Sequence, residues 1–296
     1  MKASKFLAAI LLIAVMPRLL QAEARVESNV IYGMYSGLAL LMDVHYPDTP
    51  NGYGIIEIGG RGFHEALSLD AQPLNQQSGG AEAALLERGY TLFSINHRAA
   101  PMFRYPANVE DAQRAVRFVR YHAARYGIDP TRIGAFGGSA GGYLVSMLGV
   151  LDGDGNPEDA SPINRESSRV QVVAAMNPPT DFTLFASSEG GDKGSMSSFL
   201  GTRFRQNPES EESLLYAQAS PVYYVTPDDP PFFLIHGDAD QTVPYSQSRS
   251  LEAELAQQGV TAELITIPGG GHGSWHSGEY FEPTADWFDR HLRGDH

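Results

Sequence analysis

Ser139 is the residue of this sequence best placed to act as a nucleophile. It lies in the stretch Gly137-Gly138-Ser139-Ala140-Gly141, which follows a short apolar run and precedes a run rich in Ala, Leu, Val and Met. These features predict a strand, a sharp turn and a helix, a context in which the serine hydroxyl points into a cleft. Glycines two residues before and after the serine let strand and helix approach closely. The alternative interpretation is a glycine-rich turn without a chemical role.

Asp240 and His272 could supply the acid and the base that a serine nucleophile requires. Asp240 follows the apolar run 232–236, and His272 follows the run 263–267 among glycines. Both runs are typical of buried strands. Because successive parallel strands end at one edge of a sheet, the two side chains are predicted to lie beside Ser139.

Nearby residues of the same types are alternatives for these two roles. Asp238 comes directly after the glycine that ends its strand, a position that suits a hydrogen bond within a tight turn. His276 follows His272 by four residues and suits a pocket wall, while His236 lies within its strand and is expected to be a buried core residue. Asp240 and His272 are therefore the favoured pair.

A second glycine-rich loop predicts the groups that would stabilise a negatively charged oxygen. Gly59-Gly60-Arg61-Gly62 follows the apolar run 55–58. Glycines allow a backbone N–H to approach a substrate oxygen closely. Together with Ala140 at the start of a helix, the backbone N–H groups of Gly60 and Arg61 are predicted to form this oxyanion hole. An ordinary turn is the alternative.

The elements that must position these residues alternate between strand-like and helix-like runs, which indicates an α/β fold with a mostly parallel sheet. The clearest helix covers 108–126, where apolar residues recur on one face at offsets of 4, 7 and 11 residues from Ala112. Two polar stretches, 152–169 and 182–219, interrupt the alternation, and the second is a candidate lid. Besides the run before Ser139, the expected strands are 38–46, 55–58, 91–95, 170–176, 232–236 and 263–267, and the other expected helices are 81–88 and 286–292.

Composition limits the classes of function. The 296 residues carry 35 acidic and 21 basic side chains, a net charge of −14, which argues against a nucleic-acid partner. Cysteine is absent, so disulfides and metal–thiolate sites are excluded. The stretch Asp152-Gly153-Asp154-Gly155-Asn156 resembles the start of a calcium loop. Pro157 and Ile163 occupy positions that need glycine and glutamate, so a solvated acidic loop is expected.

Residues 1–24 have the pattern of a secretory signal peptide. Lys2 and Lys5 precede an apolar run over residues 6–16, and Ala22-Glu23-Ala24 offers a cleavage site. The run is too short to span a bilayer as a helix, so no membrane anchor is expected. Residues 25–296 are interpreted as one domain of a secreted or periplasmic protein.

Several further stretches together resemble those of α/β-hydrolase-fold carboxylesterases. The resemblance covers the chain from about residue 55 to the C-terminus and is greatest to the bifunctional xylan and feruloyl esterase-like branch, near acetyl esterases and hormone-sensitive-lipase-like enzymes. The matching stretches, besides that of Ser139, are Asn96-His97-Arg98-Ala99-Ala100-Pro101, Tyr105-Pro106-Ala107, Tyr126-Gly127-Ile128-Asp129-Pro130, Ala219-Ser220-Pro221, His236-Gly237-Asp238-Ala239-Asp240 and Gly271-His272-Gly273.

The resemblance implies a mostly parallel sheet of about eight strands flanked by helices, with a small lid-like insertion. It also implies a serine esterase without metal or organic cofactor that acts on short-chain esters, acetyl or feruloyl, including those of acylated plant polysaccharide. Ser139, Asp240 and His272 take the family's catalytic positions. The candidate pocket residues are His64, Phe182, Phe185, Phe199 and Trp275.

One departure from the family pattern leaves the oxyanion donors open. The family loop usually reads His-Gly-Gly-Gly, whereas Ile58 and Arg61 replace its first and last residues here. The alternatives for function are a prolyl-oligopeptidase-type peptidase, whose N-terminal propeller has no counterpart in these residues, and a non-catalytic binding protein of the same fold. The natural ester and the oligomeric state stay open.

Overall fold

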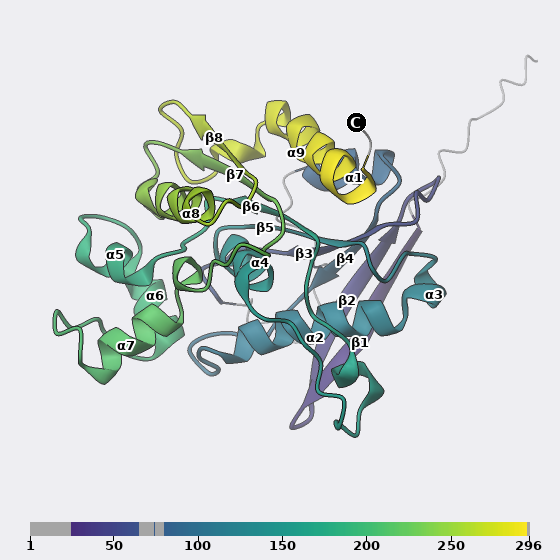
Figure 1. Ribbon diagram of the computed structural model, residues 1–296, viewed down its shortest axis with the longest axis horizontal. Coiled ribbons are helices and arrows are strands. Elements are labelled where there is room, and N and C mark those ends of the chain that lie inside the picture. Colours follow the sequence, from purple (N-terminus) through teal and green to yellow (C-terminus); the bar gives the residue numbers. More distant parts are fainter. Residues whose placement is uncertain (1–24, 65–73, 75–79, 295–296) are drawn as a thin grey trace, which may run out of the picture.

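The computed structural model describes residues 25–64, 74 and 80–294, which contain an eight-stranded sheet with helices on both faces (Figure 1). The predicted signal peptide, residues 1–24, lies outside this range. The strand order is β1-β2-β4-β3-β5-β6-β7-β8. The strands are β1 (Arg25–Tyr35), β2 (Leu38–Tyr46), β3 (Gly54–Ile58), β4 (Thr91–Ile95), β5 (Ile133–Gly138), β6 (Val172–Met176), β7 (Phe232–Gly237) and β8 (Ala262–Ile267).

The predicted α/β fold with a mostly parallel sheet is confirmed. β1 pairs antiparallel with β2, and β2 antiparallel with β4, while all the other neighbours are parallel. The strands β3, β4, β5, β6 and β7 are buried along their whole length, since helices cover both of their faces. Continuous apolar runs, rather than alternating ones, are the expected pattern for such strands.

Helices form one layer on each face of the sheet (Figure 1). One apolar core includes buried residues of α2 (Ala107–Tyr121), α3 (Ala123–Tyr126), α4 (Ala140–Val150) and α8 (Ser246–Gln257). The opposite core includes buried residues of α1 (Ala81–Glu87) and α9 (Phe281–Phe288). Short 3-10 helices are η1 (Pro162–Arg165), η2 (Pro221–Tyr223), η3 (Ser274–His276) and η4 (Gly278–Tyr280), and α9 continues as a π-helical turn, η5 (Asp289–Arg293).

Two predicted helices differ from the observed ones. The helix expected over 108–126 is interrupted at His122, whose backbone angles of φ −98° and ψ 14° leave the helical region. The C-terminal helix was predicted to cover 286–292, but it begins at Phe281 and ends in the π-helical turn. The strand β1 and the helix α8 were not predicted.

The stretch predicted as a lid, residues 182–219, folds into three short helices at one end of the sheet (Figure 1). They are α5 (Phe182–Ser187), α6 (Lys193–Leu200) and α7 (Glu211–Gln218). Each begins at a side chain that accepts a hydrogen bond from a backbone N–H of the first turn, namely that of Asp181, Asp192 or Ser210. Such N-caps stabilise helices that are too short to persist alone.

A buried ion pair fixes the loop that follows β4. Arg98 Nε donates to Asp111 Oδ1 of α2 at 2.9 Å, and the backbone N–H of Arg98 donates to Asp111 Oδ2 at 2.7 Å. The Arg98 and Asp111 side chains are 8% and 3% exposed. Farther along this loop, Ala100 N donates to the carbonyl of Phe63 at 2.9 Å. The ion pair holds this loop against α2, and the Ala100–Phe63 hydrogen bond joins the loop to the segment that follows β3.

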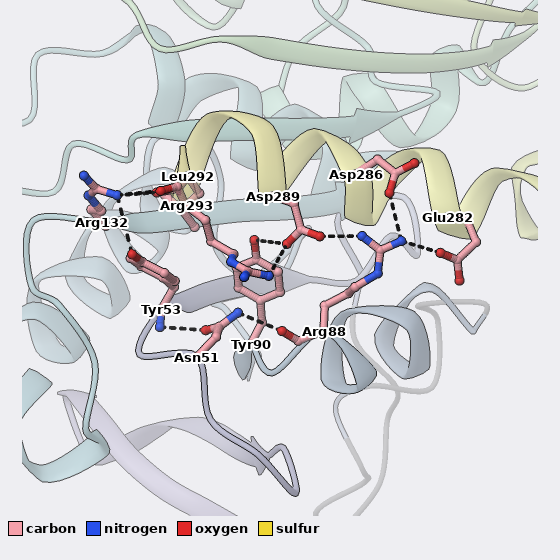
Figure 2. A network of polar contacts seen from close by, with 10 residues as sticks. All are labelled: Asn51, Tyr53, Arg88, Tyr90, Arg132, Glu282, Asp286, Asp289, Leu292 and Arg293. Atoms are coloured by element: carbon pink, nitrogen blue, oxygen red, sulfur yellow. Dashed lines mark hydrogen bonds and ion pairs between the residues drawn. The ribbon is translucent and has the colours of Figure 1, made fainter. Parts of the chain in front are cut away.

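A polar network attaches the C-terminal helix to the neighbouring elements (Figure 2). Arg88, which ends α1, lies 2.8 Å from Asp286 and also pairs with Glu282 and Asp289. Tyr90 donates to Asp289 at 2.8 Å. Because α9 follows the segment of η3 and η4, this network anchors the C-terminal end of the stretch that contains His272.

Replacing Arg98 by leucine should lower the free energy of unfolding by about 3–5 kcal/mol, because Asp111 would remain buried without its charged partner. Urea unfolding measures the loss. The matched control is Arg205→Ala, which removes an exposed pair with Glu212 and should leave the urea midpoint nearly unchanged. Equal midpoints for the two variants would contradict a stabilising role of the buried pair.

Candidate active site

Ser139 lies at the turn between β5 and α4, as predicted. Its backbone adopts φ 55° and ψ −122°, a strained conformation for a residue with a side chain. The backbone N–H of Ser139 donates to the carbonyl of Met176, at the end of β6, at 2.7 Å. This hydrogen bond to the neighbouring strand β6 therefore stabilises the turn.

The glycines on either side of Ser139 are required by close contacts. A Cβ added at Gly137 would lie 2.7 Å from the backbone of Gly141, so strand and helix touch where the sequence predicted. A Cβ at Gly141 would lie 1.9 Å from the carbonyl oxygen of Ile58. The second glycine thus lets the start of α4 approach the end of β3 and the loop that follows it.

His272 reaches Ser139 from the loop after β8. Its Nε2 lies 2.9 Å from Ser139 Oγ, and its Nδ1 lies 2.7 Å from Asp240 Oδ2. The imidazole is 28% exposed, whereas the Asp240 side chain is fully buried. With Nδ1 as donor to the carboxylate, Nε2 is left as the acceptor for the serine hydroxyl proton.

Asp240 is held as a buried carboxylate. Its Oδ1 accepts hydrogen bonds from the backbone N–H groups of Thr242 and Val243 at 2.8 and 2.9 Å. Burial by itself would raise the pKa of the Asp240 carboxyl, but interactions with His236 and His272 and the Val243 N–H outweigh it and hold this pKa well below its usual range. The carboxylate is therefore ionised at neutral pH.

Asp238 and His236, the alternatives to the favoured pair, make other contacts; His236 is a buried core residue as expected, whereas Asp238 bonds to a second turn rather than within its own. Asp238 is exposed and accepts a hydrogen bond from Gly269 N at 2.6 Å, a contact between two turns. His236 is fully buried, with Nδ1 2.7 Å from Ser248 Oγ and Nε2 2.9 Å from the Val243 carbonyl. The same Nε2 lies 3.4 Å from Asp240 Oδ2, so the buried His236 ring also contacts the Asp240 carboxylate.

Asn177 is a functional residue that the sequence reasoning missed. It follows β6 with φ 46°, a left-handed conformation that asparagine tolerates better than most residues. Its Nδ2 donates to Asp240 Oδ2 at 2.7 Å and to the carbonyl of His272 at 3.1 Å. One amide thus links the acid to the loop of the base. The available signal was an asparagine directly after an apolar strand.

Ser139 and His272 open into a cavity of about 480 Å³. Gly60, Arg61 and Trp275, three of the predicted site residues, also line it. Trp275 stacks on His276 with ring centroids 3.7 Å apart. Burial, together with the charge of His272, lowers the pKa of His276. His276 lines the cavity, as expected of a pocket wall, and the other lining residues are Gly62, Gly138, Asp192, Ser195, Thr242 and Gly273.

A much smaller cavity of about 30 Å³ also adjoins Ser139. Phe182 and Phe185 of α5 line it, as the predicted pocket residues should, and Ala140 and Met196 line it as well. Asp192 borders both cavities. Hydrogen bonds from the Ser195 side chain and backbone lower the pKa of the Asp192 carboxyl, so a fixed negative charge lies beside the nucleophile.

Two predicted pocket residues line neither cavity. Phe199 is fully buried and stacks on Phe63 with ring centroids 4.0 Å apart, so it packs behind the cavity wall. His64 is half-buried, with Nδ1 2.8 Å from the carbonyl of Ala100, and joins the loop after β3 to the loop after β4. Both residues support the site from outside it.

The predicted oxyanion loop has an unusual backbone. Arg61, Gly62 and Phe63 have φ values of 74°, 62° and 67°, all in the left-handed region. Arg61 occupies the position of the family's last glycine and adopts a conformation that glycine adopts without strain. Gly60 and Arg61 line the cavity opposite the start of α4, where Ala140 N–H has no acceptor within the helix.

Groups that could hold a metal ion, with three or more His, Asp or Glu side chains together, do not occur among residues 25–64, 74 and 80–294. In the same ranges, no helix has the length and apolar character required to cross a membrane.

Several known ester hydrolases are similar to this chain in sequence or in structure. The probable carboxylic ester hydrolase LipM of Mycobacterium tuberculosis is 32% identical over 173 residues, which are 58% of this chain and 39% of LipM. The chain thus spans less than half the length of that relative.

Two solved structures are similar over nearly the whole chain. A truncated carbohydrate esterase from gut microbiota has a TM-score of 0.77 and 28% identity, and the match covers 91% of this chain and 97% of that one. An acetyl ester-xyloside bifunctional hydrolase from Caldicellulosiruptor lactoaceticus has a TM-score of 0.74 and 26% identity, covering 88% and 95%.

The BD-FAE family matches residues 42–255, a range that contains Ser139 and Asp240. The match covers most of the chain and confirms the resemblance seen in the sequence. Together with the fold and its structural neighbours, it establishes that the chain belongs to the BD-FAE family of α/β-hydrolase esterases.

Proposed function

We propose that this protein is a serine carboxylesterase that hydrolyses short-chain acyl esters, with Ser139 as the nucleophile. The observation that carries the proposal is the continuous series of contacts Ser139 Oγ–His272 Nε2 at 2.9 Å and His272 Nδ1–Asp240 Oδ2 at 2.7 Å. The series ends in a cavity that a substrate can enter.

In the acylation step, His272 Nε2 takes the Ser139 hydroxyl proton while Oγ attacks the acyl carbon. The ionised Asp240 holds the imidazole by Nδ1 and stabilises the positive charge that develops on the ring. Because Asp240 receives its hydrogen bonds from fixed backbone groups, little reorganisation is needed when this charge appears.

The tetrahedral intermediate carries a negative oxygen that needs donors. Ala140 N–H, at the start of α4, is assigned as one donor, and the backbone N–H groups of Gly60 and Arg61 as the partners across the cavity. A single donor of this kind is typically worth about 3–4 kcal/mol of transition-state stabilisation.

Collapse of the intermediate transfers the proton from His272 to the leaving alcohol. Water then enters from the open cavity, loses a proton to His272 and attacks the acyl-enzyme. The second intermediate collapses as His272 returns this proton to Ser139 Oγ, which breaks the bond to the acyl carbon and releases the acid. Every step uses side-chain and backbone groups of this chain alone.

The two cavities suggest which substrates fit. We assign the acyl group to the cavity of about 30 Å³ beside Phe182 and Phe185, which has room for a methyl-sized group but not for a feruloyl ring. The alcohol part lies in the larger, more polar cavity with Trp275. Acetyl esters, including those on plant polysaccharide, are therefore favoured. The named activities of the neighbouring carbohydrate esterase and acetyl ester-xyloside hydrolase support this choice.

The signal-peptide pattern predicted for residues 1–24 favours a location outside the cytoplasm, either secreted or periplasmic. An acylated polysaccharide too large to cross a membrane is accessible only there.

A fluorophosphonate probe should label the wild-type protein, and Ser139→Ala should abolish both labelling and hydrolysis of p-nitrophenyl acetate. The physical reason is that the probe forms a covalent bond only with an activated serine oxygen. The matched control is Ser146→Ala, a buried serine of α4 outside both cavities. Applied to cell fractions, the same probe tests export: labelling confined to the cytoplasm would contradict it.

The same experiment separates the alternatives. Folded wild-type protein that is not labelled would favour a non-catalytic binding protein. Labelled protein that cleaves peptide anilides faster than aryl esters would favour a peptidase instead.

Aryl esters of rising chain length should show a maximum of kcat/KM at acetate, with hexanoate at least about tenfold lower, since each extra methylene exceeds the small volume beside Phe182 and Phe185. Acetylated xylan and methyl ferulate, tested in parallel, distinguish the two natural substrate classes. Equal rates on acetate and hexanoate would disprove the assignment of the acyl group to the small cavity.

Asn177→Gly should lower kcat by about 10-fold or more with little change in KM, since the amide orients the acid and the base but lies outside both cavities. Glycine is the suitable replacement because it adopts the positive φ without strain. Steady-state kinetics with p-nitrophenyl acetate measure the effect. The positioning role would be refuted by a variant that raised KM and kept the wild-type kcat.

A further inference from the structure

A second cavity, which we call the rear cavity, shares a lining residue with the small cavity that adjoins Ser139. We call the small cavity of about 30 Å³, lined by Ser139, Phe182, Phe185 and Met196 among others, the acyl cavity. The rear cavity measures about 420 Å³. It is lined by Ala186, Lys193, Gly194, Met196, Ser197, Arg203, Phe204 and Tyr216.

Among the residues that the structure describes, Met196 alone lines both cavities. It belongs to α6 and is only 2% exposed. Its neighbours in the chain divide between the two sides: Ser195 lines the acyl cavity and Ser197 lines the rear cavity. The thioether side chain therefore forms part of the wall between the small cavity beside the nucleophile and the larger one.

The helix α5 forms the rest of this partition in the same way. Phe182 and Phe185 line the acyl cavity, whereas the next residue, Ala186, lines the rear cavity. Gly191, with φ 76°, packs so closely against Phe185 that an added Cβ would lie 2.0 Å from the ring. The Phe185 ring is thus confined by the backbone of Gly191. Methionine, by contrast, is unbranched and rotates about three bonds, so Met196 is the adaptable part of the wall.

The rear cavity offers apolar contacts for a hydrocarbon chain. The rings of Phe204 and Tyr216 contact each other at an angle of 52°, with centroids 5.2 Å apart. The Tyr216 hydroxyl donates to the carbonyl of Thr202 at 3.0 Å, and Lys193 Nζ donates to that of Ser188 at 2.5 Å. A hydrocarbon chain that contacted the two rings would not need to displace either hydrogen bond.

We propose that Met196 sets the acyl-length selectivity of the site by closing the acyl cavity off from the rear cavity. The inference rests on the proposed esterase function. With methionine at this position, an acyl group longer than a few carbons meets the thioether. With a shorter side chain the two cavities join, and a medium-length chain can extend from Ser139 toward Phe204 and Tyr216.

The test measures kcat/KM for p-nitrophenyl acetate, butyrate, hexanoate and octanoate with Met196→Ala. The ratio of hexanoate to acetate is expected to rise at least about tenfold over the wild type, the discrimination typical of a few methylenes in an apolar pocket. Met196→Val, a smaller truncation, should give an intermediate ratio and serves if the alanine variant folds poorly. Melting curves and fluorophosphonate labelling establish that each variant is folded.

Two further variants make the result specific to the rear cavity. Ala186→Phe fills that cavity and should cancel the gain when combined with Met196→Ala, while leaving the wild-type chain-length profile unaltered. Met42→Ala removes an equally buried methionine of β2 that lines neither cavity, and should not change the profile.

The outcomes separate the two proposals. Folded, labelled Met196→Ala and Met196→Val with the wild-type ratio would overturn the role of Met196 and leave the esterase function intact. A gain that survives Ala186→Phe would also overturn it, because the chain would then lie elsewhere. A folded wild-type protein that neither binds the probe nor cleaves any of these esters would remove the esterase function and this inference with it.

Discussion

The buried carboxylate of Asp240 is the interaction on which the rest of the site depends. A charge without solvent is costly unless several donors surround it. Here the donors come from separate parts of the fold: Asn177 after β6, the backbone of Thr242 and Val243 after β7, and His272 after β8. The ends of three neighbouring strands must therefore lie close together to supply these donors. The same arrangement places His272 Nε2 within hydrogen-bond distance of Ser139 Oγ.

The opposite side of the site is set by a steric constraint rather than by charge. β3 lies next to β5, with Ile58 in register with Gly137, so the loop after β3 leaves the sheet beside the turn of Ser139. The absence of a side chain at Gly141 allows the Ile58 carbonyl to contact the start of α4. Arg98 and Asp111 then hold the next loop, whose Ala100 contacts Phe63. Electrostatic and steric restraints thus fix opposite walls of one cavity.

The sequence was informative where local pattern and chemistry coincide. Strand ends followed by glycine and a reactive side chain indicated the positions of Ser139, Asp240 and His272, and continuous apolar runs indicated the central strands. The helix α8 escaped prediction because its buried residues include Gln247 and Ser248 beside only two leucines. β1 is an exposed edge strand, with Tyr32 its one buried residue. Neither element shows a clear apolar period.

Residues that act through sheet order could not be read from the sequence in the same way. Asn177 looks like a turn residue until β6 is known to lie between β5 and β7. Phe199 and His64 look like pocket residues because they are aromatic and lie in loop-like stretches, but burial and a hydrogen bond to Ala100 direct them elsewhere. Met196 could not be singled out from the sequence, because its proposed role depends on the two cavities that it lines.

The carboxylate of Asp192, which borders both cavities, bears on how the reaction ends. An ester is neutral when it enters, whereas the acid formed from it is an anion at neutral pH. That product is generated beside a carboxylate whose pKa is lowered by Ser195, within a chain of net charge −14. Like charges repel more strongly in a partly buried site than in water. In the proposed reaction, the turnover itself thus creates the force that expels the product and keeps free acid from competing with the next ester.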